Sequence, residues 1–97
     1  MATTVILEPK RAVFVRAQVL ALYDACFYQI YDSCPPPGEA LAQDTNMRDW
    51  ADLDQLWDGL NVRFVGLDED AIYGRTTLRD LIEGILAEWN GEYREPD

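Results

Sequence analysis

Carboxylates and tryptophans concentrate in one short stretch of the chain, residues 49–60, which reads DWADLDQLWDGL. On a helix with 100° per residue, its three leucines lie on one side and its two tryptophans border that side. Asp54 and Asp58 stand just beyond the tryptophans, four residues apart, where like charges cost a helix roughly a few tenths of a kcal/mol. A cationic partner would relieve this repulsion, and aromatic and charged groups are typical of interface hot spots. The predicted partner-binding residues are Asp49, Trp50, Asp52, Asp54, Trp57 and Asp58.

A second interpretation of the same stretch stays open. The tryptophans could complete a hydrophobic core while the aspartates merely solvate the outer side of an amphipathic helix. An assembly module is a related alternative, in which Trp50, Trp57, Phe64 and Trp89 make a hydrophobic contact with a second copy or another subunit. Salt separates these classes, because charge-driven binding weakens in salt whereas hydrophobic association persists.

The sequence contains few other residues that could serve catalysis or metal binding. The chain contains no histidine, which excludes Ser-His and Cys-His nucleophile pairs and histidine-based zinc sites. The run Asp68-Glu69-Asp70 lacks the alternating spacing and the glycine of a calcium loop, which favours a solvated turn. The remaining carboxylates form no matched acid and base in an apolar pocket that the sequence reveals. We therefore expect a protein that is not an enzyme and that holds no metal ion and no cofactor.

The charge of the chain is unevenly placed. The 97 residues carry 18 Asp plus Glu against 8 Lys plus Arg, a net charge of −10. Residues 1–36 sum to zero, whereas residues 37–97 hold five arginines against fifteen carboxylates. Such a protein repels nucleic acid and anionic lipid, so a charged partner should be a basic protein. Because no apolar run approaches the roughly 20 residues of a membrane span and no signal peptide is evident, we expect a cytoplasmic protein.

The stretch Leu53-Asp54-Gln55-Leu56-Trp57-Asp58-Gly59-Leu60 resembles the barstar family of intracellular ribonuclease inhibitors. The inhibitory helix of that family carries a Leu-Asp-x-Leu-Trp-Asp-x-Leu pattern, and the expected order strand, helix, helix, strand, helix is also similar. The resemblance implies that Asp54 and Asp58 approach the basic, phosphate-binding site of a nuclease and imitate its substrate.

From Asp49 to Ile85 the chain is also similar to the back half of an acyl carrier protein, with an acidic helix, Phe64, an acidic loop and a final helix. That family attaches phosphopantetheine to a serine that follows an aspartate. Here Trp50 follows Asp49, and Ser33, the only serine, precedes a proline run. The resemblance therefore implies at most a carrier-like fold without phosphopantetheine, used for binding.

The first third of the chain predicts a strand and a long helix. Thr3–Leu7 is β-branched and apolar, which indicates a strand, and Pro9 fits the first turn of a helix that runs to about Asp32. An alternative places a strand at Arg11–Val15 before a shorter helix. The predicted apolar stripe comprises Val15, Val19, Leu22, Cys26 and Ile30, widened by Phe14, Ala17, Leu20, Ala21 and Phe27. Cys26 and Cys34 would be about 12 Å apart along a continuous helix, too far for a disulfide, so we expect two buried thiols.

The remainder predicts two helices, one strand and two irregular segments. Residues 34–46 contain a proline run and are expected to form a loop with at most one weak turn. Asp49 is the expected cap of the acidic helix, and the alternation after it predicts a strand near Val62–Leu67. A hairpin that turns near Gly66–Asp70 and returns on Ala71–Tyr73 is an alternative. Thr77 and Asp80 resemble a capping box for the last helix, which Gly91 stops, and the polar tail 92–97 is expected to fray.

Together these features predict one α/β domain over residues 1–97, mainly helical, with three helices and two short strands. A helical bundle with a β-hairpin is the alternative. The expected function is non-catalytic: an acidic protein that occludes a basic site on a nuclease or other nucleic-acid-binding machinery by mimicking nucleic-acid charge. Immunity proteins, antitoxins and phage anti-defence inhibitors of the anti-CRISPR type belong to this physical class. A homodimer is an open alternative for its oligomeric state.

Overall fold

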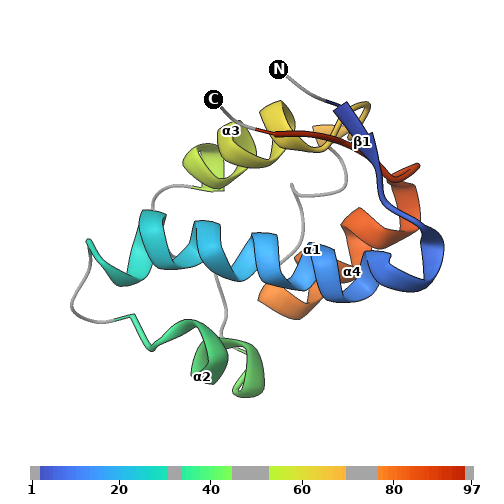
Figure 1. Ribbon diagram of the computed structural model, residues 1–97. Coiled ribbons are helices and arrows are strands. Elements are labelled where there is room, and N and C mark those ends of the chain that lie inside the picture. The colour runs from blue at the N-terminus through green and yellow to red at the C-terminus, as the bar shows by residue number, and fades with distance from the viewer. Residues whose placement is uncertain (1–2, 31–33, 45–52, 70–76, 96–97) are drawn as a thin grey trace.

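The computed structural model describes residues 3–30, 34–44, 53–69 and 77–95 (Figure 1). Its elements in chain order are β1 (Thr3–Val5), α1 (Glu8–Tyr23), the π-helix η1 (Asp24–Tyr28), α2 (Pro37–Ala42), α3 (Leu53–Arg63), α4 (Leu78–Glu88) and β2 (Glu92–Arg94). The two strands form one antiparallel sheet. The predicted fold class, a small and mainly helical α/β domain, is therefore confirmed.

The long N-terminal helix begins where the sequence predicts, but the residues that it buries differ from the predicted apolar stripe. Pro9 lies in the first turn of α1, and the helical conformation continues through η1, so the alternative strand at Arg11–Val15 is wrong. The fully buried side chains recur every four residues, at Val15, Val19, Tyr23 and Phe27. Leu22 and Cys26 are only half-buried, and Ile30 is exposed because it lies beyond the end of η1. Ala17 and Ala21, expected to widen the buried stripe, are exposed.

The helix that carries the acidic motif is longer than predicted. Asn61, Val62 and Arg63 belong to α3, so the predicted strand at Val62–Leu67 is wrong. The alternation that indicated a strand also fits a helix in which Leu60 and Phe64, four residues apart, are buried while Val62 remains 54% exposed. Phe64 then forms a single antiparallel bridge with Tyr93. The expected cap Asp49 and the alternative return strand Ala71–Tyr73 lie outside the described residues.

The start of the last helix is as predicted. The Thr77 hydroxyl accepts a hydrogen bond from the backbone N–H of Asp80 at 3.1 Å, which is the expected cap of α4. The helix ends at Glu88, and Gly91 follows with φ +95°, a left-handed conformation that favours glycine.

The C-terminal tail is ordered as a strand rather than frayed, at least as far as Arg94. β2 pairs with β1 in the register Thr3↔Arg94, Thr4↔Tyr93 and Val5↔Glu92. On its other side, the carbonyl of Glu92 accepts hydrogen bonds from the Val65 N–H at 3.0 Å and from the indole of Trp89 at 2.8 Å. Tyr93 is 7% exposed. The sequence of the tail does not predict this strand, because the tail is mostly polar and only one side chain of the strand lies in the core.

The proline-containing segment forms a short helix, which corrects the prediction of a loop with one weak turn. Pro37 lies in the first turn of α2, where its missing N–H costs nothing, and Ala40 and Leu41 are buried. The Tyr23 hydroxyl donates to the carbonyl of Pro35 at 2.7 Å. Arg79 of α4 donates to the Leu41 carbonyl at 3.2 Å, so α2 is tied to both α1 and α4.

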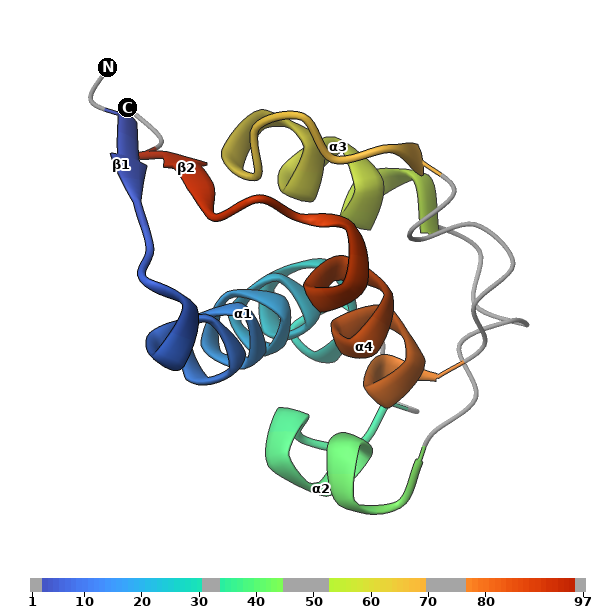
Figure 2. The same cartoon turned by 90° about the vertical axis from the view of Figure 1, so that its right-hand side faces the viewer.

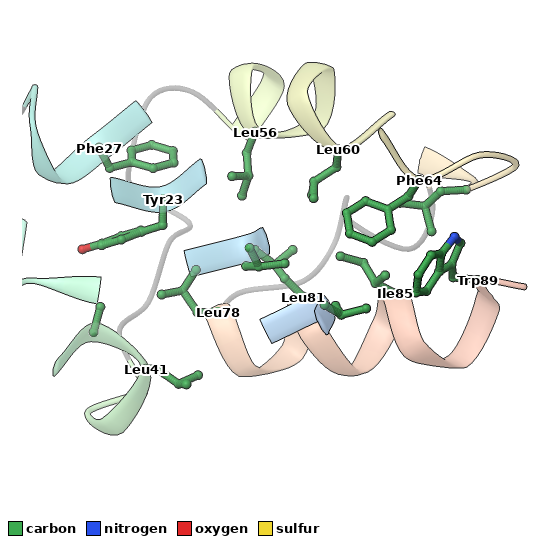
Figure 3. Packing of buried hydrophobic residues seen from close by; sticks show 14 of the residues in the cluster. Tyr23, Phe27, Leu41, Leu56, Leu60, Phe64, Leu78, Leu81, Ile85 and Trp89 are labelled. Atoms are coloured by element: carbon green, nitrogen blue, oxygen red, sulfur yellow. The ribbon is translucent and has the colours of Figure 1, made fainter. Parts of the chain in front are cut away.

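One hydrophobic core joins these elements. α1 packs against α4, with α3 and α2 on opposite sides of this pair and the small sheet at one end (Figures 1 and 2). Figure 3 shows leucines of α3 and α4 pointing toward one another, with Tyr23 and Phe27 closing one end. The other end is aromatic: Phe14, Phe64, Trp89 and Tyr93 contact one another, with ring centroids 4.7 to 6.4 Å apart. Both cysteines are free thiols, as predicted, with Cys34 buried and Cys26 half-buried.

Candidate protein-binding face

The inner side of α3 is fixed by the core. Leu56 and Leu60 are fully buried and point toward α4 (Figure 3), and Phe64 continues the same line just beyond the helix. Among the α3 side chains that the structure describes, five are exposed, and we call them the α3 outer face: Asp54, Gln55, Asp58, Asn61 and Val62. At 100° per residue they share one continuous side of the helix, opposite the leucines.

As predicted, Trp57 lies at the border between the buried and the exposed sides of α3. Its side chain is half-buried and packs against the core, while Asp54 and Asp58 are exposed on the neighbouring side. Part of the indole is therefore a core contact, as the open alternative held, and part is available at the surface. Trp57 thus places an aromatic edge directly beside two carboxylates.

The structure brings together only part of the predicted site. Asp54, Trp57 and Asp58 share α3, whereas Asp49, Trp50 and Asp52 lie outside the described residues. Phe64 and Trp89, which the assembly alternative placed in a surface contact, are 0% and 4% exposed. Their burial in the aromatic end of the core leaves them no part in a surface.

A close contact with α1 holds α3 in place from the side. A Cβ atom at Gly59 would lie 2.8 Å from a methyl carbon of Leu22, so the glycine permits the two helices to approach closely. The Arg63 guanidinium donates to the Gly59 carbonyl at 2.7 Å and is half-buried. A cation near the C-terminal end of a helix interacts favourably with the helix dipole. On a helical projection Arg63 points away from Asp58, so it does not neutralise the α3 outer face.

Among the described residues, the charged side chains nearest to α3 in sequence are mostly carboxylates. Among the described residues, Asp58 has no hydrogen-bonding or ion-pair partner. Asp68 and Glu69, from the predicted acidic loop, are exposed a few residues after α3, and Asp70 lies outside the described part of the chain. Arg79 is engaged elsewhere, in an ion pair with Asp44 at 3.4 Å. Asp54 and Asp58 are therefore exposed carboxylates on a helix that the core holds in place.

Three titratable groups with raised pKa values, Tyr23, Cys34 and Cys26, lie in the core or against it. Burial raises the pKa of Tyr23, and the neighbouring Cys34 thiol raises it further. Burial also raises the pKa of the Cys34 thiol, partly offset by its hydrogen bond with Tyr23. The pKa of Cys26 is raised by burial as well, and the nearby Arg63 opposes that shift. These groups stay neutral near pH 7 and contribute to packing. The four-residue spacing from Val15 through Val19 is the sequence pattern that could have predicted the burial of Tyr23.

Within residues 3–30, 34–44, 53–69 and 77–95, no group of three or more His, Cys, Asp or Glu side chains is placed to hold a metal ion. None of the helices in the same ranges is both long enough and apolar enough to cross a membrane.

Comparison of the chain with protein-family models, with curated proteins and with solved structures gave no match.

Proposed function

We propose that this protein is a non-catalytic, cytoplasmic binding protein whose α3 outer face occupies a basic site on a partner protein. The partner class is a nuclease or other nucleic-acid-binding machinery, and the carboxylates of Asp54 and Asp58 take the place of phosphate charge. Immunity proteins, antitoxins and phage anti-defence inhibitors of the anti-CRISPR type act in this physical manner. The resemblance of residues 53–60 to the barstar family favours the same assignment.

The observation that carries the proposal is the exposure of Asp54 and Asp58 on a helix whose opposite side is fully buried. Four residues of helix separate the two Cα atoms by about 6 Å along the axis, so the charges are held at a defined spacing. Because Leu56 and Leu60 anchor the helix in the core, little conformational entropy is lost when the face binds. The half-buried Trp57 supplies an apolar edge of the kind that dominates binding energy at interfaces.

The net charge supports a basic partner. A chain of net charge −10 attracts a basic surface over a distance of about 10 Å at 0.1 M salt and repels nucleic acid itself. Association should therefore be fast at low salt and slow markedly as the salt concentration rises.

The test is a pair of double variants used as bait in affinity capture from the native host. Asp54→Ala with Asp58→Ala removes the proposed contact, whereas Glu83→Ala with Glu88→Ala removes two exposed carboxylates from α4 and serves as the matched control. Both variants have the same net charge. The partner retained by the unchanged protein should be lost with the α3 variant, kept by the control, and displaced by added RNA or duplex DNA.

The expected loss of affinity is about 2–5 kcal/mol, measured by calorimetry with the purified partner, because truncated charge pairs at interface centres cost this much. Circular dichroism should show both variants folded, since exposed substitutions change stability by only about 0.5 kcal/mol. Equal weakening by the two variants would mean that net charge, rather than the α3 outer face, drives binding. Unchanged affinity of the α3 variant would overturn the assignment.

A further inference from the structure

α1 has an uncovered side that contacts no other described element. Its exposed residues Lys10, Val13, Ala17 and Ala21, together with the half-exposed Asp24, fall within a narrow arc of the helix at 100° per residue. We call these five residues the α1 outer face. In Figure 1 α1 lies in front of α4, and Figure 2 shows α4 on one side of α1 with α3 and α2 on opposite sides of this pair.

Exposed apolar side chains gather at this end of the sequence. Among the described residues, the large exposed ones are Val5, Leu7, Val13, Tyr28, Ile30 and Val62. All but Val62 precede residue 31, and Val13, in the middle of α1, is the most exposed at 75%. Val13 therefore places a large, exposed apolar side chain on the α1 outer face.

Charge identifies the occupant. Residues 1–36 carry no net charge, while the rest of the chain carries −10, so two copies repel each other at most orientations. The α1 outer face itself holds one lysine and one aspartate and therefore no net charge, so two such faces can approach each other without net repulsion between them. We propose that this face is a homodimer interface, in which α1 packs against α1 of a second copy in antiparallel orientation about a two-fold axis at Ala17.

The order of the residues selects the antiparallel arrangement. With Ala17 facing the partner's Ala17, Val13 lies opposite the partner's Ala21 and Lys10 lies opposite the partner's Asp24. Both ends of the interface therefore carry an oppositely charged pair. A parallel arrangement would instead place lysine against lysine and aspartate against aspartate. The small side chains at the centre allow the helix axes to approach to about 8 Å.

The expected dimer is weak and reversible. α1 and η1 together span about 30 Å, so one pair of helices buries less area than the roughly 1,200–2,000 Å² of a standard stable interface. We therefore expect a dimer that dissociates on dilution. Asp24 accepts a hydrogen bond from the Gln29 side chain at 2.6 Å, which orients its carboxylate without neutralising it.

The experiment is sedimentation equilibrium of the full chain over a wide range of protein concentrations, with single-residue variants. Ala17→Glu places two negative charges against each other on the axis and should abolish the dimer. Lys10→Glu should weaken it by about tenfold, because two attractive pairs become repulsive. Arg16→Glu makes the same change of charge on another side of α1 and is the matched control, with a much smaller effect expected.

A mixing experiment tests the orientation. Lys10→Glu and Asp24→Lys should each impair self-association, whereas an equimolar mixture of the two should form a heterodimer, because each glutamate then meets a lysine. A chain that stays monomeric at the highest concentrations, or a dimer that survives Ala17→Glu, would overturn the proposed interface. A dimer that is lost with Ala17→Glu but gains nothing from mixing would overturn the antiparallel arrangement. Variants of Asp54 and Asp58 should leave self-association intact, so this proposal and the proposed function fail separately.

Discussion

Gly91 connects the last helix to the C-terminal strand, and its replacement by alanine tests whether that connection stabilises the fold. Its φ of +95° is strained for any other residue. A Cβ atom there would also collide with the Arg11 guanidinium. That guanidinium donates from Nε to the Ile6 carbonyl at 2.8 Å and lies 6.0 Å from the centre of the Trp89 ring. Gly91→Ala therefore perturbs both the turn and the packing between α1 and α4.

The expected loss of stability has three parts. The left-handed conformation costs an alanine about 1–2 kcal/mol. Displacement of Arg11 loses a hydrogen bond worth about 1 kcal/mol and a cation–π contact worth about 0.5–1 kcal/mol. The sum is about 2.5–4 kcal/mol, which lowers the melting temperature of a chain of this size by roughly 10–30 °C.

Two other glycines provide matched controls in urea and thermal unfolding followed by circular dichroism. Gly66 has φ +78° but open space around its Cβ position, so Gly66→Ala should lose only the conformational part, about 1–2 kcal/mol. Gly38 lies in α2 with open space and an ordinary φ, so Gly38→Ala should be neutral or stabilising by up to about 1 kcal/mol. If Gly91→Ala costs no more than Gly66→Ala, the close packing of Arg11 over the turn is refuted.

Two further predictions concern the core. Because burial raises the pKa of Cys34 from its ordinary value of 9.0, the folded thiol keeps its proton at a pH where the unfolded thiol loses it. The contribution of this thiol to the free energy of unfolding is therefore complete below about pH 9 and is lost as the pH rises further, by up to about 1.4 kcal/mol per pH unit. In urea titrations at increasing pH, Cys34→Ala should make this loss of stability smaller. Leu60→Ala should cost about 2–5 kcal/mol in the same assay, whereas Val62→Ala should change stability by about 0.5 kcal/mol or less. A comparable loss for both would contradict the orientation of α3.

The sequence predicted the structure correctly where all residues of a pattern lie within one helix or next to it. The cap at Thr77, the proline at the start of α1 and the acidic edge of α3 all depend on residues within a few positions of one another, and each was predicted. The ends of elements depend on partners far away in sequence. Nothing near Tyr93 in the sequence indicates a strand, because its pairing partner lies in β1 and its aromatic contacts are Phe14 of α1 and Phe64, which follows α3.

The strand predicted after the acidic helix failed for a related reason. Valine, arginine and phenylalanine in alternation fit a half-buried strand and the last turn of a helix equally well, and the contacts of Phe64 decide between them. In the candidate site, helical spacing correctly placed Asp54, Trp57 and Asp58 on adjoining sides of α3. The exposure of Ala17 and Ala21 was not predictable, since apolar residues on a long helix are expected to be covered and the covering elements come later in the chain.

The two proposed surfaces respond to salt in opposite directions, which separates them in a single titration. Binding through Asp54 and Asp58 depends on attraction between opposite charges and should weaken as the Debye length shrinks. Self-association through α1 joins two chains of net charge −10 through a mostly apolar face. Salt screens both the repulsion between the two chains and the attraction within their two Lys10–Asp24 pairs. Because the repulsion is the larger of the two, added salt should favour the dimer. Sedimentation should therefore show more dimer, and calorimetry weaker partner binding, in the same high-salt buffer. Parallel weakening of both would mean that the dimer is held by charge rather than by the apolar centre of the α1 outer face.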